Sequence, residues 1–335
     1  MSVLMPCRDA ASTLEAAISS IVAQSLSDFE LVAVDDGSSD GTSERLRAWA
    51  ERDSRLRLLR IEARGIIPAL NAGLGVCRAP VIARMDADDI AEPNRLRSQL
   101  DLLSARPELA AVGCLVAGYP PAELAEGFRL YIEWQNRLTE PEAIAREIFI
   151  ESPLVHSSVS VRREWLERVG GYQERGWAED YDLWLRMHIA GARFAKVAAV
   201  LLHWRDHPLR LTRTDSRYSV ENFLRAKSHY LMQGPLQGRD AVIVWGAGQM
   251  GRRLAKHLQR DGAPLSAFVD IDPRKIGRER RGRPIVAPSA LPDLWGQHQR
   301  PVVLACVGSR GARQLIREQL EAAGLREGSD WWAAA

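Results

Sequence analysis

The sequence predicts an α/β protein built on a mostly parallel β-sheet with helices on both faces, followed by a smaller α/β domain. Three observations lead to this prediction. The first hundred of the 335 residues alternate apolar runs with segments whose apolar side chains recur at helical spacing. A strand, a glycine turn and a helix are expected again at residues 240–262. The chain length by itself favours about two domains.

The first hundred residues contain a repeated strand–helix unit. Strands are expected at residues 2–7, 29–36, 56–61 and 79–86, and helices at 11–24, 43–53 and 67–77. The turn "GSSDGT" follows the second strand and offers hydroxyl and carboxylate caps to the next helix. Repeats of this length place the strands parallel, because each helix returns the chain to the same edge of the sheet.

The remainder of the chain is expected to complete this domain and add a second one. Helices are expected at 179–192 and 218–232, and a strand at 196–204. Gly234 and Pro235 end the second helix, so the predicted domains are 1–232 and 240–335, with residues 233–239 as the linker. Further strands at 265–270 and 300–308 predict a small Rossmann-like domain.

Composition narrows the class of protein. With 46% apolar and 26% charged residues, the chain is typical of a soluble globular protein, and its net charge of +2 gives no reason to expect nucleic acid. The four cysteines have no C-x-x-C spacing and are expected to be reduced thiols. Neither a signal peptide nor an apolar run of about 18 residues is present, so we expect a cytoplasmic protein, at most peripheral to a membrane.

Acidic residues follow two of the predicted strands. Asp35 and Asp36 end the second strand, and "RMDADD" places Asp86, Asp88 and Asp89 after the fourth. In a parallel sheet these positions lie at one edge, where ligands bind. A Mg²⁺ or Mn²⁺ ion with a bound diphosphate would explain the crowded carboxylates. The alternative is structural: Asp36 forms an Asx-turn and Asp89 caps a helix.

Two long segments resemble the start of a family 2 glycosyltransferase with the A-type nucleotide-sugar fold. They are "VLMPCRDAASTLEAAISSIVAQSLSDFELVAVDDGSSDGT" and "RGIIPALNAGLGVCRAPVIARMDADDIAEPNRLRSQ". The resemblance implies an inverting transferase that uses a nucleoside-diphosphate sugar, with a UDP-sugar favoured, and a divalent metal. It assigns nucleotide-sugar contacts to Pro6, Asp35, Asp36, Arg64, Asp86 and Asp88, and metal binding to Asp88, Asp89 and His207.

An inverting transfer also needs a general base for the acceptor hydroxyl. "WAEDYDLWLR" offers Glu179 and Asp180 before an apolar helix, and it resembles the acidic pair of the family. On that resemblance Asp180 is the expected base. The alternative is that one of these acids only caps the helix.

The histidines give weaker signals. His203 and His207 are four residues apart, but Pro208 favours an extended chain there, so a helical metal pair is not expected. His207 resembles a late histidine of the family that helps to bind metal or diphosphate. His156 occupies a position where the family often has a histidine near the acceptor.

A second candidate site lies in the predicted C-terminal domain. Gly246, Gly248 and Gly251 fit G-x-G-x-x-G between a strand and a helix, and Asp270 ends the next strand. NAD(P) or another nucleotide is one interpretation, without a catalytic role; a structural or regulatory module is the other. The six Lys and Arg residues within 274–283 suit a 2′-phosphate, an anionic membrane face or, most simply, a solvated loop.

The favoured function is sugar transfer to a glycan or lipid-linked glycan acceptor in cell-surface polysaccharide biosynthesis. Tyr131 and Trp134 either stack on the acceptor sugar or pack a core. One alternative is a nucleotide-sensing binding protein with an inactive transferase-like domain. A sugar-phosphate nucleotidylyltransferase is disfavoured, because "MPCRDAAST" lacks the glycine-rich loop expected after the first strand.

Overall fold

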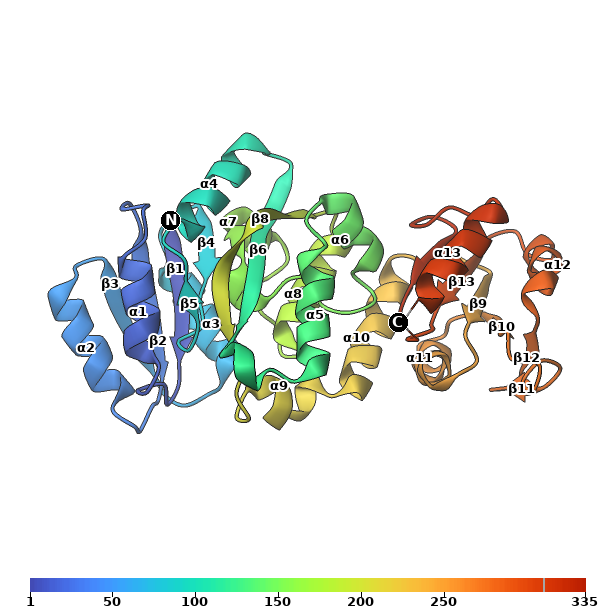
Figure 1. Cartoon of the computed structure of the whole chain (residues 1–335), viewed down its shortest axis with the longest axis horizontal. Coiled ribbons are helices and arrows are strands. Elements are labelled where there is room, and N and C mark those ends of the chain that lie inside the picture. Colours follow the sequence, from blue (N-terminus) through green and yellow to red (C-terminus); the bar gives the residue numbers. More distant parts are fainter. Residues whose placement is uncertain (310) are drawn as a thin grey trace. The chain divides into compact units, whose positions relative to one another are not determined.

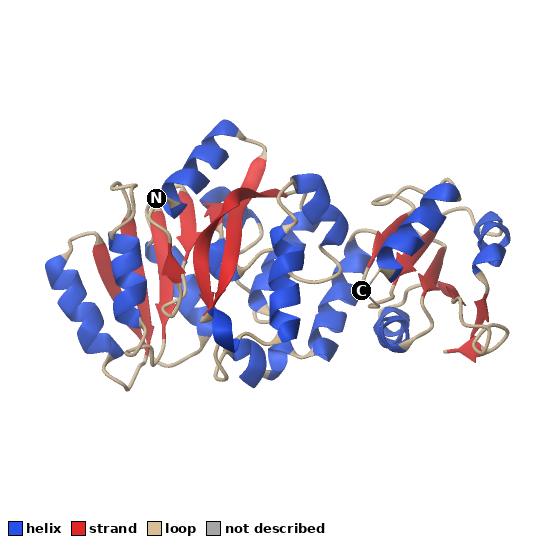
Figure 2. Cartoon of the chain, in the orientation of Figure 1, coloured by secondary structure: helices blue, strands red, loops and turns tan. Residues whose placement is uncertain are grey.

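A computed structural model describes residues 1–309 and 311–335, which form two compact units (Figure 1). The first unit consists of Met1–Ile144, Pro153–Arg175 and Glu179–Arg213. The second consists of Ala145–Ser152, Gly176–Ala178 and Thr214–Ala335. Each unit has its own sheet covered by helices, so the predicted α/β class is confirmed (Figure 2).

The first part of the chain forms the predicted strand–helix repeat. Its elements are β1 (Ser2–Cys7), α1 (Leu14–Val22), β2 (Glu30–Asp36), α2 (Thr42–Arg52), β3 (Leu56–Ile61), α3 (Ile66–Val76) and β4 (Val81–Arg84). The four strands are parallel in the order β3-β2-β1-β4. Alternation along β1 explains the two covered faces: Val3 and Met5 share a core with residues of α1, whereas Leu4 lies against Gly73 of α3.

Four more strands extend this sheet to eight, in the order β3-β2-β1-β4-β7-β6-β8-β5, and of these β7 and β5 run antiparallel to the rest. The apolar run from Leu109, which is too short to span a membrane, forms a buried strand parallel to β8. The elements are β5 (Ile90–Ala91), α4 (Arg95–Ala105), β6 (Leu109–Tyr119), η1 (Pro121–Glu123), α5 (Glu126–Asn136), α6 (Pro141–Glu147), η2 (His156–Ser158), β7 (Ser160–Arg162), α7 (Arg163–Arg168), α8 (Glu179–Ile189), β8 (Arg193–Arg205) and α9 (Leu211–Thr214).

The second unit contains a six-stranded sheet in the order β11-β12-β10-β9-β13-β14, parallel except for β11 against β12. Its elements are η3 (Ser216–Tyr218), α10 (Val220–Gln233), β9 (Ala241–Trp245), α11 (Gln249–Arg260), β10 (Leu265–Val269), β11 (Glu279–Arg280), β12 (Arg283–Val286), η4 (Pro288–Ala290), α12 (Leu291–Gly296), β13 (Pro301–Ala305), α13 (Ala312–Ala322) and β14 (Trp331–Ala333).

The compact units differ from the predicted domain limits at two short segments, 145–152 and 176–178, and from Thr214 onward, which includes one long helix. The sequence assigns residues 218–232 to the first domain, but α10 belongs to the second unit. Glu221 at its start forms ion pairs with Arg253, Lys256 and His257 of α11, and these contacts hold the two helices together. The linker at 233–239 stays a prediction.

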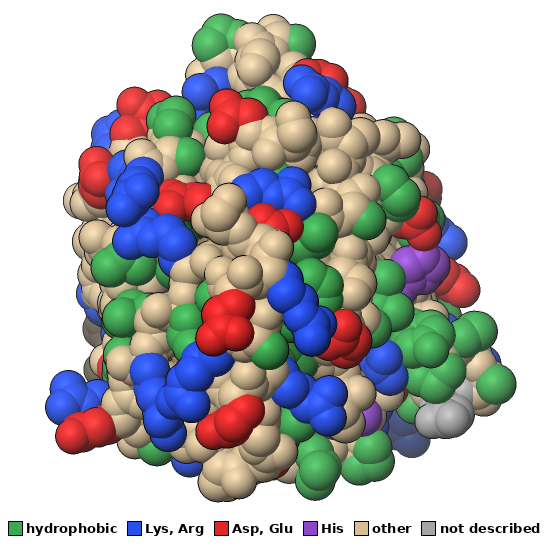
Figure 3. All heavy atoms as spheres, turned by 90° about the vertical axis from the view of Figure 1, so that its left-hand side faces the viewer, with side chains coloured by type: hydrophobic (Ala, Val, Ile, Leu, Met, Phe, Trp, Pro, Cys, Tyr) green, Lys and Arg blue, Asp and Glu red, His purple; other side chains and the backbone are tan. Residues whose placement is uncertain are grey.

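One face of the surface and the four thiols agree with the composition. Figure 3 views the molecule from the side of α2, and on that face Lys and Arg side chains are interspersed with Asp and Glu. All four cysteines are free and buried. Among the described residues, none of the helices has the length and apolar character needed to cross a bilayer.

Candidate active site

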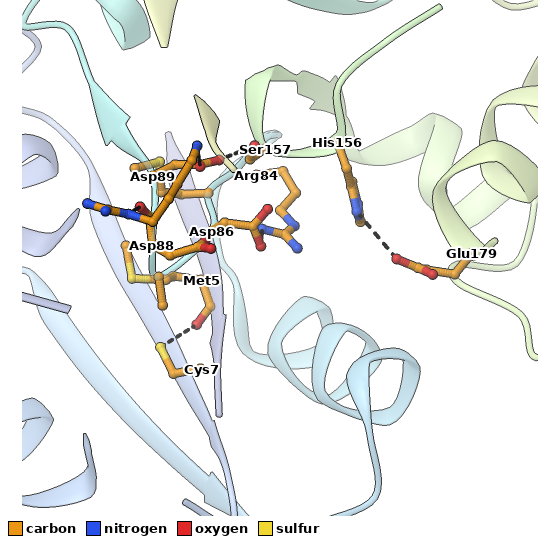
Figure 4. Close-up of polar contacts among 12 residues, drawn as sticks. Met5, Cys7, Arg84, Asp86, Asp88, Asp89, His156, Ser157 and Glu179 are labelled. Carbon is orange, nitrogen blue, oxygen red and sulfur yellow. Dashed lines mark hydrogen bonds and ion pairs between the residues drawn. The ribbon is translucent and has the colours of Figure 1, made fainter. Parts of the chain in front are cut away.

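The carboxyl ends of β1, β2 and β4 meet at one edge of the first sheet, because these strands are parallel and in register. The segment after β4 brings Asp86, Asp88 and Asp89 together there (Figure 4). One carboxylate oxygen from each lies within 4.8 Å of the others. These oxygens are suitable ligands for a hard divalent cation such as Mg²⁺ or Mn²⁺.

His207 lies beside Asp88 of this cluster. The Asp88 Oδ2 atom lies 3.1 Å from His207 Nε2, and their side chains are 30% and 36% exposed. Burial, followed by the charge of Asp86, raises the pKa of Asp88. His207 lies beyond the end of β8, outside any helix, as Pro208 predicts. An external cation between the two side chains would relieve the repulsion among the carboxylates.

Asp89 is the buried member of the cluster, at 1% exposure. Its carboxylate accepts hydrogen bonds from Ser157 Oγ at 2.5 Å and from the backbone N–H of Arg205 at 2.8 Å. Burial and the charges of Asp88 and Asp86 raise its pKa well above the ordinary range. Asp89 therefore fixes the loop after β4 to η2 and β8, and its role as a metal ligand stays a prediction.

Arg84 supplies positive charge beside the acids. Its Nη1 atom donates to Asp86 Oδ1 at 2.5 Å, and its side chain is only 6% exposed. Burial opposes its charge, but Asp86 and Glu179 more than compensate and raise the pKa of Arg84. Its buried Nε has no hydrogen-bond partner among the described residues. A buried guanidinium with an unused N–H next to carboxylates fits a site for a cation-bound diphosphate.

Asp35 and Asp36 hold the neighbouring loops. Asp36 accepts from the backbone N–H groups of Arg64 and Gly65 at 2.8 and 2.9 Å, and from Arg8 Nη1 at 3.2 Å. Asp35 accepts from the backbone N–H of Ser38 at 3.0 Å. The Asp36 carboxylate thus bonds to a distant loop and not to the turn that follows it, so the described contacts do not form the Asx-turn of the alternative interpretation. The contacts of Asp35 and Asp36 with a nucleotide stay predictions.

Arg64 and Pro6 flank this pair. The guanidinium of Arg64 is largely exposed and pairs with Glu62 at 3.2 Å. It borders a surface pocket of about 310 Å³, whose lining residues are Ile61, Glu62, Arg64, Pro68 and Ala72. Pro6 is buried in β1 and pairs with Val34 of β2.

Glu179 and Asp180 begin α8, as predicted, but their surroundings differ. Glu179 is buried at 3% exposure, and its Oε1 lies 3.7 Å from His156 Nδ1. Asp180 is less buried, and its Oδ1 accepts the backbone N–H of Tyr181 at 2.7 Å. The structure thus places His156 beside the acidic pair rather than within the aspartate cluster (Figure 4).

Three other candidate side chains lie outside the acid cluster. His203 pairs with Glu92 at 2.6 Å, so only the second histidine of the pair reaches an aspartate of the cluster. Tyr131 stacks on Trp134 with ring centroids 5.8 Å apart and lies 6.1 Å from the ring of Trp204. These half-buried rings pack on one another, which agrees with the core interpretation.

The glycine turn of the second unit has the expected backbone. Gly246 has φ +115°, and a Cβ on Gly251 would lie 1.9 Å from the carbonyl oxygen of Gly246. Asp270, however, is engaged within the unit: its oxygens accept the backbone N–H groups of Ala247 and Asp272, both at 2.9 Å, and Lys275 Nζ lies 3.0 Å away. The carboxylate at the position expected for a ribose-binding acid therefore already has hydrogen-bond and ion-pair partners within the unit. Nucleotide binding here stays a prediction.

Sequence reasoning missed Arg84, Ser157 and Tyr172 as parts of the site. Arg84 stands inside the quoted motif "RMDADD", and its place at the end of a strand was an available signal. Ser157 and Tyr172 lie 68 and 101 residues along the chain from their partners Asp89 and Asn71. No local pattern marks such long-range contacts.

Comparison with known proteins identifies the family. A family model described as "Glycosyl transferase family 2" matches residues 2–170, which include the aspartate cluster and η2. The chain belongs to glycosyl transferase family 2. It is therefore an enzyme of the glycosyltransferase class.

Several glycosyltransferases resemble the chain in sequence. It is 34% identical over 193 residues to "Amylovoran biosynthesis glycosyltransferase AmsE" of Erwinia amylovora, a match that covers 56% of this chain and 69% of the relative. It is 38% identical over 104 residues to "UDP-Glc:alpha-D-GlcNAc-diphosphoundecaprenol beta-1,3-glucosyltransferase WfgD" of Escherichia coli, covering 31% of this chain and 40% of that protein.

Solved structures support the fold. TarS of S. aureus in complex with UDP-GlcNAc is 16% identical, with a TM-score of 0.57 over 77% of this chain and 71% of that chain. The mannosyltransferase PcManGT of Pyrobaculum calidifontis, in complex with GDP-Man and Mn²⁺, is 20% identical, with a TM-score of 0.50 over 97% of this chain and 80% of that chain. At these identities the likeness supports the A-type fold of the first unit.

Proposed function

We propose that the chain is a metal-dependent, inverting glycosyltransferase that takes its sugar from a nucleoside-diphosphate sugar, with a UDP-sugar favoured. The observation that carries this proposal is that one unit contains both a group of side chains suited to a metal-bound diphosphate and a second pair of acids that can supply a general base. An aspartate cluster with His207 and a buried Arg84 suits a cation-bound diphosphate. A second acidic pair, Glu179 and Asp180, supplies a carboxylate near the same guanidinium.

The proposed metal site uses two partly exposed donors and one buried donor. Asp88 and His207 are half-buried and adjacent, and the buried Asp89 supplies a third ligand, the second carboxylate of the set. The cation would offset negative charge on the departing diphosphate. Arg84, with its unused Nε, is the protein cation that would act with it.

Asp180 is the proposed base because Glu179 is buried against His156, whereas Asp180 is the more accessible acid. Its carboxylate would accept the proton of the acceptor hydroxyl as that oxygen forms a bond to the anomeric carbon. The bond between that carbon and the diphosphate breaks on the opposite face, and the diphosphate departs with the electron pair. One displacement of this kind inverts the configuration at the anomeric carbon.

The nucleotide contacts rest on the β2–α3 side of the site. We assign Asp36 and Arg64, with Asp35, Asp86 and Pro6, to the nucleoside. The pocket beside Arg64 supports this assignment. The names of AmsE and WfgD support an acceptor in polysaccharide biosynthesis, which we propose to be a glycan or a lipid-linked glycan. Such an acceptor implies work in the cytoplasm, peripheral to the inner face of a membrane.

The test is turnover with purified protein. UDP-glucose, UDP-galactose, UDP-GlcNAc and GDP-mannose are each incubated with Mn²⁺ and a lipid-linked glycan acceptor, and release of UDP or GDP is measured. We expect one donor to be consumed and its release to stop with EDTA. If every donor binds by calorimetry but none is turned over with any acceptor, the chain is a nucleotide-sensing protein instead.

A further inference from the structure

The short turn η2 connects the two halves of the candidate site. Ser157 Oγ donates to Asp89, and the preceding residue, His156, faces Glu179 (Figure 4). Ser158 anchors the turn itself, because its Oγ donates to the Val155 carbonyl at 2.7 Å. Two consecutive side chains therefore link the aspartate cluster to the acidic pair of α8.

A tyrosine completes this link on the side of His156 away from Glu179. The Tyr172 hydroxyl lies 2.7 Å from His156 Nε2, and its ring is buried. Asn71 of α3 holds the tyrosine backbone: it accepts the N–H of Tyr172 at 3.0 Å and donates to its carbonyl at 2.8 Å. Gly171 has φ +66°, and a Cβ there would lie 2.9 Å from Asn71 Oδ1, so only glycine allows this clamp.

The partners of His156 determine which of its nitrogens carries the proton. Burial and the nearby charge of Arg84 lower the pKa of His156 well below its ordinary value, so the ring is neutral. Burial raises the pKa of Tyr172, so its hydroxyl keeps its proton. A phenol that donates to Nε2 leaves the remaining N–H on Nδ1, which faces the Glu179 carboxylate. The opposite tautomer would set a lone pair against that carboxylate.

We propose that Tyr172 and His156 are positioning residues for the general base. Tyr172 fixes the tautomer of His156, so the Nδ1–H dipole of His156 is directed at the Glu179 carboxylate 3.7 Å away, and this electrostatic contact orients Glu179 in the first turn of α8. The neighbouring Asp180 is then presented to the acceptor hydroxyl. This inference rests on the proposed function of Asp180 as base, and neither Tyr172 nor His156 touches the reacting atoms.

The first test is a kinetic one. Tyr172→Phe removes only the hydroxyl, and we expect kcat to fall between about 10- and 100-fold while KM for the donor and the affinity for UDP with Mn²⁺ stay unchanged. Tyr230→Phe makes the same change at a buried tyrosine of the second unit and should leave kcat unaltered. A purely structural Tyr172 would instead change donor binding and thermal stability without a selective loss of kcat.

A double-mutant cycle tests whether Tyr172 acts through the tautomer of His156. His156→Asn places an amide that can donate an N–H near the position of Nδ1, and that N–H needs no help from Tyr172. We expect His156→Asn to retain most of kcat, His156→Leu to lose it as Tyr172→Phe does, and Tyr172→Phe to have no further effect in the His156→Asn background. Additive losses would overturn the proposal.

A spectroscopic measurement separates this proposal from the proposed function. In ¹⁵N-histidine-labelled protein, the His156 resonances are assigned by their loss in the His156→Asn variant. We expect a protonated Nδ1 and an unprotonated Nε2 in the native chain, and a mixture of tautomers in Tyr172→Phe. A protonated Nε2 in the native chain would refute the positioning role even if sugar transfer is observed. The expected spectrum without any transfer would refute the proposed function alone.

Discussion

Both sheets of this chain have acidic residues at the carboxyl ends of their strands, but the protein compensates the charge of these acids to different extents. In the second unit, Asp270 accepts two backbone N–H groups and pairs with Lys275 at 3.0 Å. In the first unit, Asp86 pairs with Arg84 and Asp88 lies beside His207, whereas Asp89 accepts hydrogen bonds, among the described residues, only from the Ser157 hydroxyl and the Arg205 N–H. At the same position of an α/β sheet, the carboxylate of the second unit has internal hydrogen-bond and ion-pair partners, whereas the carboxylates of the first unit have too little positive charge around them.

The pKa shifts express this difference. Burial and mutual repulsion raise the pKa of both Asp88 and Asp89, which shows that the protein's own groups do not fully compensate these charges. A group of carboxylates in that condition is stabilised by an added cation. Acids at a strand end indicate a ligand site only where the protein leaves their charge uncompensated.

The largest expected effect tests whether the chemistry belongs to the first unit. Asp180→Asn keeps the shape of the side chain but removes the base, so kcat should fall between about 10²- and 10⁴-fold. Donor affinity, measured by calorimetry with UDP and Mn²⁺, should stay unchanged. Asp101→Asn, at an exposed position of α4, is the matched control and should behave as the native chain. Full activity of Asp180→Asn would show that another group is the base.

The next effect compares the two acidic edges directly. Asp88→Asn should weaken Mn²⁺-dependent binding of UDP at least about tenfold, because it removes an oxygen donor of the proposed metal site. Asp270→Asn removes the corresponding acid of the second unit and should leave that affinity unchanged. Titration calorimetry with and without Mn²⁺ measures both. If the two variants lose equal affinity, the contrast between the edges is wrong.

A smaller effect concerns the role of the glycine turn in the second unit. Gly251→Ala forces a Cβ against the carbonyl of Gly246 and should destabilise this unit by about 1–3 kcal/mol. Gly248→Ala meets nothing within 4 Å and should leave stability nearly unchanged. Thermal unfolding measures both, and the same assay with added NAD⁺ or NADP⁺ should show no shift. A clear shift that Gly248→Ala abolishes would make the turn a nucleotide site.

The last effect is a pH dependence of the first unit, which is gradual and less than about 1.4 kcal/mol over any one pH unit. Burial lowers the pKa of Lys196 from 10.5 to about 7, and its Nζ donates to the carbonyl and side-chain oxygens of Gln135. Burying the charged ammonium of Lys196 destabilises the fold fully below about pH 7. This cost falls as the pH rises from 7 toward 10.5, the pKa of an unfolded lysine, so the free energy of unfolding should rise by at most about 1.4 kcal/mol per pH unit.

Hydrogen exchange of β6 and β8 between pH 7 and 9 measures this slope. Lys196→Met should flatten it, because no titratable group then remains at this buried position. Arg193 is an exposed cation on the same strand, and Arg193→Met should leave the slope as it is in the native chain. An unchanged slope in Lys196→Met would show that another group titrates.

Local patterns predict the first four strands of the first sheet and the acids at its edge. The strands at 2–7 and 56–61 match β1 and β3, because apolar runs and turn residues are properties of neighbouring side chains. The position of the aspartates after β4 follows from the same reasoning. The middle of the chain was harder, since β7 has three residues and β5 has two, too few to form a readable pattern.

The sequence by itself determined the α/β class, the family and the residue types available at the candidate site. Only the tertiary structure decided which of them meet: Asp88 and His207 are 119 residues apart, and Ser157 reaches Asp89 across 68. It also decided that Asp89 is buried, that Lys275 forms an ion pair with Asp270, and that the Glu179 side chain faces His156. The physical reason is that charge compensation depends on distances between strand ends and loops, and these are set by pairing across the whole sheet.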